Sequence, residues 1–335
     1  MSLRSARFAA LLGTMLATLM MPIVSAEPNA SLVLERTIAL PGVSGRIDHM
    51  AVDLARHLLF VAELGNNTVD VVDVNSGQIR HRITGLSEPQ GVAYAGQADL
   101  LAVANAGDGS VCLFRGDDFA LAATIALGDD ADNIRIDPRT GRLVVGYGRG
   151  GLAIIDPVRR TVVADIKLAA HPESLQIDPQ TPRAFVNVPD AQQIAVVDLR
   201  AQQQVASWKV PQARANFPMA LDSANARLAV VFRKPARLVL LDTGTGAVVA
   251  SRPTCGDADD VFFDTKRHRL YVSCGDGVVD VFEDSPTGYR ALDSTKASSG
   301  ARTSLFVPDL DRLFVAARAG LLGSDASILV FRPIP

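Results

Sequence analysis

The stretch DLARHLLFVAELGNNTVDVVD, residues 53–73, decides the fold because close variants of it recur along the whole chain. Short apolar runs are centred on key valines at near-constant spacing: Val61, Val103, Val145, Val186, Val230, Val272 and Val315. The successive gaps are 42, 42, 41, 44, 42 and 43 residues. A period of about 40 to 45 residues with several strands per period is typical of β-propeller blades.

Aspartates recur at fixed places around the key valines. They lie eight residues before the valine or eleven to twelve after it: Asp53, Asp137, Asp178, Asp222 and Asp264 before, Asp73, Asp156, Asp198 and Asp242 after. In the first repeat we predict strands over 47–52, 58–63, 69–74 and 79–83. The apolar runs are continuous, as in strands packed on both faces. The sequence therefore predicts an all-β, seven-bladed β-propeller with four-stranded blades.

The two ends of the chain predict how the ring closes. The seventh repeat stops after its third strand, at 328–331. The segment from Leu32 to Leu40 is the candidate for the missing outer strand, since its residues 37–40 echo 124–127. We expect this N-terminal strand to pair with the last blade and leave no open edge at the seam. One other stretch, 284–299, departs from the period, and we predict a surface excursion there.

The first residues resemble a secretory signal peptide, predicted over residues 1–26. Arg4 and Arg7 precede an apolar stretch over 8–24, and Val24-Ser25-Ala26 forms a small-residue cleavage site. The alternative is an uncleaved membrane anchor, because the apolar stretch approaches the minimum spanning length of roughly 17 residues. We favour cleavage, which leaves one β-propeller domain over 27–335. We expect it to be periplasmic or secreted, monomeric, and without stable membrane insertion.

Charge and cysteine usage limit the function classes further. The formal net charge is −3 with both signs spread throughout, so there is no basic stripe for nucleic acid and none is expected as a partner. Cys112 lies in an apolar strand and is predicted as a buried small hydrophobe. Cys255 and Cys274 flank one hairpin of the sixth repeat, and they form either a disulfide or two free thiols.

Polar residues gather at the predicted mouth of the central channel. In propellers the innermost strand usually runs from the ligand-binding face, so residues just before it surround the mouth. The position 13 residues before each key valine holds Asp48, Gln90, Asp132, Glu173, Phe217, Asp259 and Arg302. The next position holds His49, Gly91, Asn133, Ser174, Pro218, Asp260 and Thr303. The ends of the second strands add Glu63, Asn105 and Asn187.

These positions supply the candidate site residues. Asp132 and Asp259 are candidate ligands for a hard divalent cation such as calcium. His49 or Glu173 is the candidate general base, and Arg302 would steady a developing oxyanion. The remaining candidates for ligand binding are Asp48, Glu63, Asn105, Asn133, Asn187 and Asp260. The alternative interpretation is that these groups cap strands and line a water-filled channel.

The remaining motifs give little further evidence about function. His171 precedes Glu173 and could form a ligand pair with it, although a histidine before Pro172 is more often a loop cap. The sequence has no Gly-x-Ser-x-Gly elbow, which disfavours a serine hydrolase, and no Cys-x-x-Cys-His, so a haem is not supported.

The repeats at 59–62, 184–187, 270–273 and 313–316 read Leu-Phe-Val-Ala, Ala-Phe-Val-Asn, Leu-Tyr-Val-Ser and Leu-Phe-Val-Ala. They resemble the YVTN-type β-propeller repeat, and the chain after the signal peptide resembles an exported YncE-like propeller protein. This resemblance implies a seven-bladed ring in the cell envelope but implies little about activity. Related propellers include lactonases, a streptogramin lyase and subunits of periplasmic amine-oxidising dehydrogenases.

The predicted function is binding of a small molecule or partner protein at the channel mouth. One alternative is a metal-assisted hydrolase or lactonase that uses the same acidic residues. Another is an interaction scaffold for periplasmic redox partners, which would need an exposed apolar patch.

Overall fold

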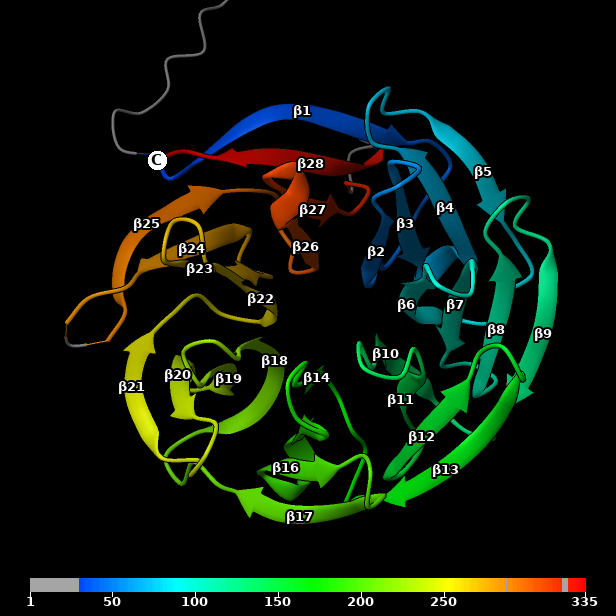
Figure 1. Ribbon diagram of the computed structural model, residues 1–335. Helices are drawn as coiled ribbons and strands as arrows, with labels where there is room; N and C mark the ends of the chain where they lie inside the picture. The colour runs from blue at the N-terminus through cyan, green and yellow to red at the C-terminus, as the bar shows by residue number, and fades with distance from the viewer. Residues whose placement is uncertain (1–29, 287, 321–324) are drawn as a thin grey trace, which may run out of the picture.

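Seven antiparallel sheets of four strands surround a central axis in the computed structural model of the chain (Figure 1). The structure describes residues 30–286, 288–320 and 325–335, so the predicted signal peptide lies outside the described residues. The predicted seven-bladed, all-β propeller with four-stranded blades is confirmed. Within the described residues no helix has the length and apolarity needed to cross a membrane.

Within each blade the strands, here a to d, follow the chain from the axis outward. Blades one to three are β2 (Met50–Asp53), β3 (Leu58–Glu63), β4 (Thr68–Asp73), β5 (Ile79–Ile83); β6 (Pro89–Ala95), β7 (Leu100–Asn105), β8 (Ser110–Arg115), β9 (Leu121–Ala126); and β10 (Ala131–Ile136), β11 (Leu143–Tyr147), β12 (Gly151–Asp156), β13 (Thr161–Lys167). Blades four and five are β14 (Leu175–Ile177), β15 (Arg183–Val188), β16 (Gln193–Asp198), β17 (Gln203–Trp208); and β18 (Arg214–Asp222), β19 (Arg227–Lys234), β20 (Ala236–Asp242), β21 (Val248–Pro253). Blades six and seven are β22 (Ala258–Asp264), β23 (Arg269–Cys274), β24 (Val278–Glu283), β25 (Arg290–Lys296); and β26 (Ser304–Val307), β27 (Arg312–Ala317), β28 (Ala326–Pro333), β1 (Leu32–Leu40). Short 3-10 turns occur at Leu64–Asn66, Pro189–Ala191 and Pro308–Leu310.

Strand β1 closes the ring as the outer strand of blade seven. It pairs antiparallel with β28, from Leu32 opposite Pro333 to Leu40 opposite Ala326. The predicted closing strand is therefore confirmed, with the same bounds. Because β1 covers the edge of β28, the seam between the chain ends has the same four strands as the other blades.

The hydrophobic core is divided among the interfaces between neighbouring blades. In β3, Leu59 and Val61 belong to the cluster shared with blade seven, whereas Phe60 and Ala62 belong to the cluster shared with blade two. The described residues form one such cluster at each of the other interfaces. Strand b is buried on both faces, which explains its continuous apolar sequence.

The recurring aspartates hold turns. Asp53 Oδ1 accepts hydrogen bonds from the backbone N–H groups of Ala55 and Arg56, at the turn between strands a and b. At the turn between strands c and d, Asp198 Oδ1 accepts from Arg200 and Ala201, each at 2.8 Å. An aspartate before a tight turn favours it in this way, so the periodic carboxylates are structural.

The prediction of a surface excursion over 284–299 is wrong. This stretch contains β25, a regular outer strand of blade six that pairs with β24. Outer strands are exposed on one side, so their sequence is polar, and the apolar period used to locate strands did not detect this one.

The three cysteines form one disulfide and leave one free thiol. Cys255 and Cys274 form a disulfide with their Cα atoms 5.9 Å apart. Cys112 is half-buried rather than buried, because it lies on β8 opposite Thr124 of the outer strand.

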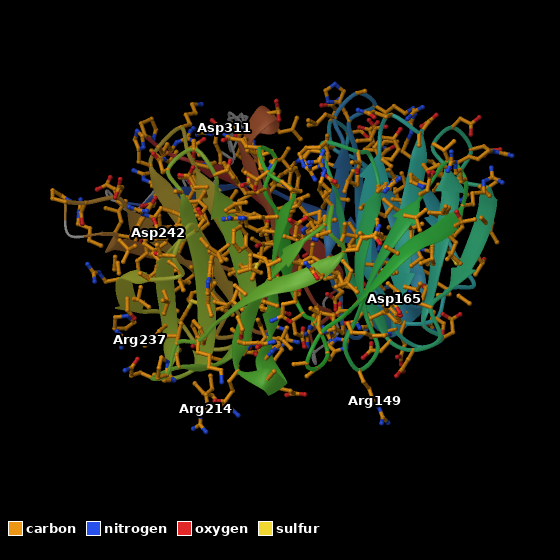
Figure 2. All side chains as sticks on the ribbon, turned by 60° about the horizontal axis from the view of Figure 1, so that its bottom comes forward. Arg149, Asp165, Arg214, Arg237, Asp242 and Asp311 are labelled. Atoms are coloured by element: carbon orange, nitrogen blue, oxygen red, sulfur yellow. A yellow bond between two sulfur atoms is a disulfide. The ribbon has the colours of Figure 1, made fainter. Side chains whose placement is uncertain are left out.

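The a strands run from one flat face of the ring to the other. We call the face where they begin the mouth face and the one with the turns between strands a and b the opposite face. Figure 2 shows Arg149 and Arg214 extending from the mouth face, while Asp311 lies at the opposite face.

Candidate functional site

The starts of strands a bring most of the predicted site residues to one end of the channel, in adjoining groups. The deepest group is formed by His49, Asn133 and Asp260, from blades one, three and six. His49 Nε2 lies 3.1 Å from Asn133 Nδ2 and 3.6 Å from Asp48 Oδ1, and His49 Nδ1 lies 3.9 Å from Asp260 Oδ1. Asp260 Oδ2 also accepts the backbone N–H of Ser304 at 2.7 Å.

Burial has the largest single effect on the pKa values of the side chains in this deep group. It raises the pKa of Asp260 to about 7 and that of Asp48 to about 6, against the opposing charge of His49. Burial lowers the pKa of His49, but Asp48 and Asp260 outweigh it and raise the value overall. The negative charges of Asp259 and Asp132 also raise the pKa of Asp48, so the groups at the mouth share one electrostatic field.

The second group joins Asp132 to His171 and Glu173, from blades three and four. One potential ligand atom from each of these side chains lies within 4.8 Å of the others. His171 Nδ1 lies 2.6 Å from the carbonyl oxygen of Gly148 and must donate to it, which leaves Nε2 facing Asp132 Oδ2 at 3.6 Å. A backbone carbonyl that fixes one ring nitrogen in this way is the usual support of a metal-binding histidine.

Two glycines allow this group to form. The segment with His171 and Glu173 lies against β11, where a Cβ on Gly146 would come within 2.9 Å of Pro172. A Cβ on Gly91 would lie 2.1 Å from the carbonyl oxygen of Asp132. The Glu173 N–H donates to the Asn187 carbonyl at 2.9 Å, which fixes the segment at the start of blade four.

Electrostatics in this second group favour a positive charge between the carboxylates. Burial opposes a charge on His171, but the carboxylate of Asp132 and the Gly148 carbonyl raise its pKa to about 9. Burial, followed by the negative charge of Asp132, raises the pKa of Glu173 to about 7. A cation bound between these side chains would stabilise the ionised form of Glu173, and it must displace the proton of His171.

The third group is a network of arginines and aspartates from blades five to seven. Asp259 receives Arg233 Nη2 at 2.6 Å on one oxygen and Arg302 Nε at 2.8 Å on the other. Asp257 bridges the same arginines, and the Arg233 guanidinium stacks 3.8 Å above the ring of Phe217. Because two guanidiniums neutralise Asp259, it does not join Asp132 in one metal site.

A positive rim adjoins this network. Arg318, just after β27, is half-buried, and its pKa is lowered by burial and by the neighbouring charges of Arg302 and Arg46. A hollow of about 760 Å³ on the mouth face is lined by Phe217, Arg233 and Lys234, among others. Because Asp257 also lines this hollow and pairs with Arg233, the positive charge that remains for an anionic group on this side includes that of Arg318 and Lys234.

Some predicted ligand-binding residues are engaged in structural contacts instead. Glu63 accepts a hydrogen bond from Thr68 in its own hairpin. Asn105 donates to Ser110 Oγ at 3.1 Å within blade two. Asn187 donates to the Phe217 carbonyl at 2.8 Å and so links blades four and five.

Sequence reasoning placed the mouth correctly in the chain but omitted some of its members: His171, Arg233, Asp257 and Arg318. His171 stands two residues before the periodic position of Glu173, and its place before Pro172 fits a loop cap as well as a ligand. Arg233 follows Val230 at the end of strand b, the position that supplied other candidates, but β19 extends two residues longer than β3 and carries it to the mouth.

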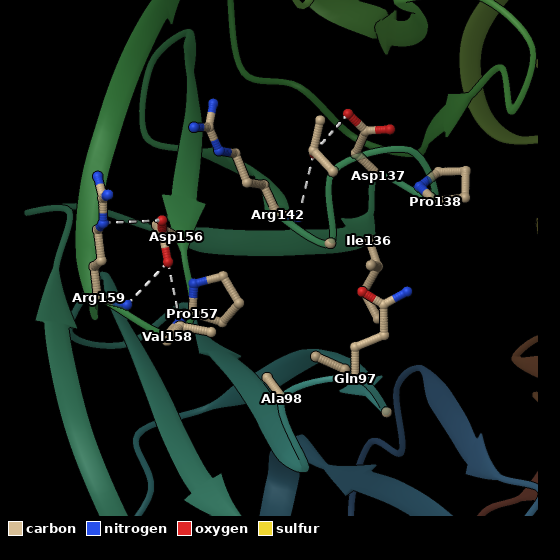
Figure 3. Close-up of a pocket in the computed structure, with 14 residues that line it drawn as sticks. Gln97, Ala98, Ile136, Asp137, Pro138, Arg142, Asp156, Pro157, Val158 and Arg159 are labelled. Carbon is tan, nitrogen blue, oxygen red and sulfur yellow. Dashed lines mark hydrogen bonds and ion pairs between the residues drawn. The ribbon is translucent and has the colours of Figure 1, made fainter.

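A further hollow lies away from the mouth, between blades two and three. It has a volume of about 520 Å³ and is lined by the turns around Gln97, Asp137 and Asp156 (Figure 3). Asp137 accepts from Thr140, and Asp156 accepts from the backbone of Val158, so both carboxylates serve their own turns. We assign no chemistry to this hollow.

No family model and no curated protein matches the sequence. Among solved structures, a chain of Kuenenia stuttgartiensis hydrazine synthase has a TM-score of 0.74 and 16% identity, covering 87% of this chain and 98% of that one. A chain of a mitotic checkpoint complex has a TM-score of 0.77 and 15% identity, covering 99% and 100%. At these identities the likeness shows a seven-bladed β-propeller and nothing about activity.

Proposed function

We propose that this protein binds a small anionic ligand at the channel mouth, with the help of a divalent cation held by Asp132, His171 and Glu173. The observation that carries the proposal is the convergence of these side chains, with His171 Nε2 left free by the bond from Nδ1 to Gly148. One ligand atom from each side chain lies within 4.8 Å of the others, so small side-chain rotations would bring all three onto one ion.

The ligand set favours a first-row transition ion over calcium. One imidazole nitrogen and two carboxylates suit zinc or manganese, whereas calcium prefers oxygen ligands alone. With three protein ligands, a zinc ion keeps an open position for water or a bound molecule.

On the mouth face, the side formed by blades five to seven supplies positive charge for the ligand. Arg318 has no carboxylate within 4.0 Å among the described residues, and Arg233 and Lys234 line the adjoining hollow. An anionic ligand can therefore be bound by the cation on one side and by the guanidinium of Arg318 on the other.

We further propose that the protein works in an oxidising compartment, as an exported member of the YVTN-repeat propellers. The Cys255–Cys274 disulfide supports this proposal, since stable disulfides occur mainly in secreted and periplasmic proteins. The recurring Leu-Phe-Val-Ala motifs at 59–62 and 313–316 support the family.

A metal-assisted hydrolase or lactonase is the second candidate. His49, which is not among the proposed ligands of the cation, would act as the general base for a cation-bound water. This candidate requires the same cation, so the cation test precedes any screen of lactones.

Isothermal titration calorimetry with Zn²⁺, Mn²⁺ and Ca²⁺ tests the proposal. We expect one equivalent of Zn²⁺ or Mn²⁺ to bind, and His171→Asn to weaken binding at least tenfold. His57→Asn is the matched control, because His57 is exposed on the opposite face. Since the cation must displace a proton from His171, whose pKa is about 9, affinity should rise from pH 6 to pH 8.

Equal binding by the His171→Asn and His57→Asn variants would refute the assignment. Preference for Ca²⁺ with no effect of His171→Asn would instead place the ion on oxygen ligands elsewhere.

A further inference from the structure

A ring of equivalent positions on the a strands lines the channel below the mouth, ten residues before each key valine. Each pairs with the residue just before that valine, as Ala51 pairs with Phe60 and Arg135 with Val144. All but one of these positions are uncharged: Ala51, Ala93, Gln176, Ala220, Phe262 and Leu305. The exception is Arg135.

These residues enclose one cavity of about 470 Å³. His49 and Asp260 bound its inner end, and it extends to Thr265 and Pro308, which follow the a strands at the opposite face. Among the described residues, Asp132, His171 and Glu173 of the mouth do not line this cavity. The cavity is thus separate from the proposed cation site, and its volume falls within roughly 300–1,000 Å³, the range of small-molecule sites.

Arg135 brings a charge without a protein counter-ion into this cavity. Its Nη1 donates to the Ile134 carbonyl at 2.8 Å, and within the described part of the chain no carboxylate oxygen lies within 4.0 Å of the guanidinium. By contrast, Arg233 and Arg302 at the mouth are both paired with Asp259. Arg135 is half-buried, an arginine stays charged in a protein, and a charge partly removed from bulk water is stabilised by a partner.

Burial lowers the pKa of Arg135 and the negative charges of Asp260 and Asp132 raise it, but among the described residues neither carboxylate lies within 4.0 Å of the guanidinium. Asp260 accepts the Ser304 N–H at 2.7 Å and faces His49 at 3.9 Å, so its carboxylate is turned to blades one and seven. The inner end of the cavity therefore holds Arg135 with no carboxylate in direct contact among the described residues, while Phe262 and Leu305 make the neighbouring wall apolar.

We propose that this cavity binds a small organic monocarboxylate with an apolar body, which enters from the opposite face and places its carboxylate against Arg135. The guanidinium offers the planar pair of N–H groups that a carboxylate accepts. The apolar body then lies along Phe262, Phe263 and Phe306, and its transfer from water supplies most of the affinity. This site is independent of the cation proposed at the mouth.

Calorimetric titration with two matched pairs tests the proposal: hexanoate against 1-hexanol, and phenylacetate against 2-phenylethanol. We expect a carboxylate to bind at least tenfold more tightly than its alcohol, and Arg135→Gln to remove that preference. Ala51→Phe should abolish binding by filling the cavity, since the equivalent ring position already accommodates Phe262. Arg149→Gln, which alters an exposed arginine on the mouth face, is the control for charge.

Several outcomes decide the matter. Equal affinity for acids and alcohols, no binding of any carboxylate at millimolar concentration, or an Arg135→Gln variant with unchanged binding would overturn the proposal. If Arg135→Gln does not fold, the comparison of acids with alcohols and the Ala51→Phe variant decide it. Loss of carboxylate binding in His171→Asn would place the anion at the mouth instead, and would also contradict the proposal.

Discussion

At the scale of single residues, two sets of carboxylates in this protein have different roles: caps of tight turns and members of the mouth. Asp53 and Asp198 accept backbone N–H groups at tight turns, as the recurrence of aspartate would lead one to expect. Asp132 and Asp260 stand outside that pattern and have charged neighbours from other blades. The carboxylates at the turn positions therefore maintain the fold, and those at the starts of strands a are available for chemistry.

Glu63 gives a pH-dependent test at this scale. Burial raises its pKa to about 8, from an ordinary value of 4.5. The folded state thus retains a proton that the unfolded chain releases, so this group lowers stability as the pH rises from about 4.5 to 8. Glu63→Gln should have nearly the stability of the unaltered protein at pH 5 and be about 1–2 kcal/mol more stable at pH 8.5.

Urea unfolding at both pH values measures the effect of Glu63→Gln. The control is Glu88→Gln, because Glu88 is exposed. Identical pH profiles for the Glu63→Gln variant and the unaltered protein would show that Glu63 is ionised when folded.

At the scale of strands, bulges explain which site residues could not be predicted. Register shifts interrupt β6, β10, β18 and β22 near their first residues, where the chain enters each blade. A bulge changes which of two consecutive residues faces the channel. Counting back from the key valines therefore located the mouth but could not pair His49 with Asn133, or Asp132 with His171.

How accurately the bounds of a strand could be predicted depends on how deeply the strand is buried. Strands buried on both faces, such as β3, are apolar throughout and were located with their correct bounds. The bounds of strand β1 were also correct, because its residues 37–40 echo residues 124–127 in and after the outer strand β9. Strand β25 has only exposed or half-buried side chains, so apolar periodicity could not reveal it.

Strand β1 should be essential for the closed ring. Leu40 is fully buried in the interface between blades seven and one, whereas Leu34 on the same strand is 49% exposed. Leu40→Ala should lower the free energy of unfolding by about 2–4 kcal/mol, and Leu34→Ala by less than about 0.5 kcal/mol. Chemical denaturation of the two variants measures the difference, and equal losses would contradict a structural role for this strand.

At the scale of the whole molecule, the repeat predicts the ring because each blade buries its neighbours' apolar faces. The interfaces are alike, so one pattern of valines specifies all of them. The mouth is where that repetition fails, since each blade brings a different side chain to the same place. A repeat can therefore locate such a site in the chain, but its chemistry depends on contacts between blades that no single repeat contains.

The most direct test of the cation proposal is anomalous diffraction from crystals grown with Zn²⁺ or Mn²⁺. The account predicts one strong anomalous peak at the channel mouth, about 2.0–2.2 Å from His171 Nε2 and from a carboxylate oxygen of Asp132 and of Glu173. In crystals of His171→Asn the peak should be absent or much weaker. No peak between these side chains in the unaltered protein, at cation concentrations that saturate the calorimetric titration, would contradict the account.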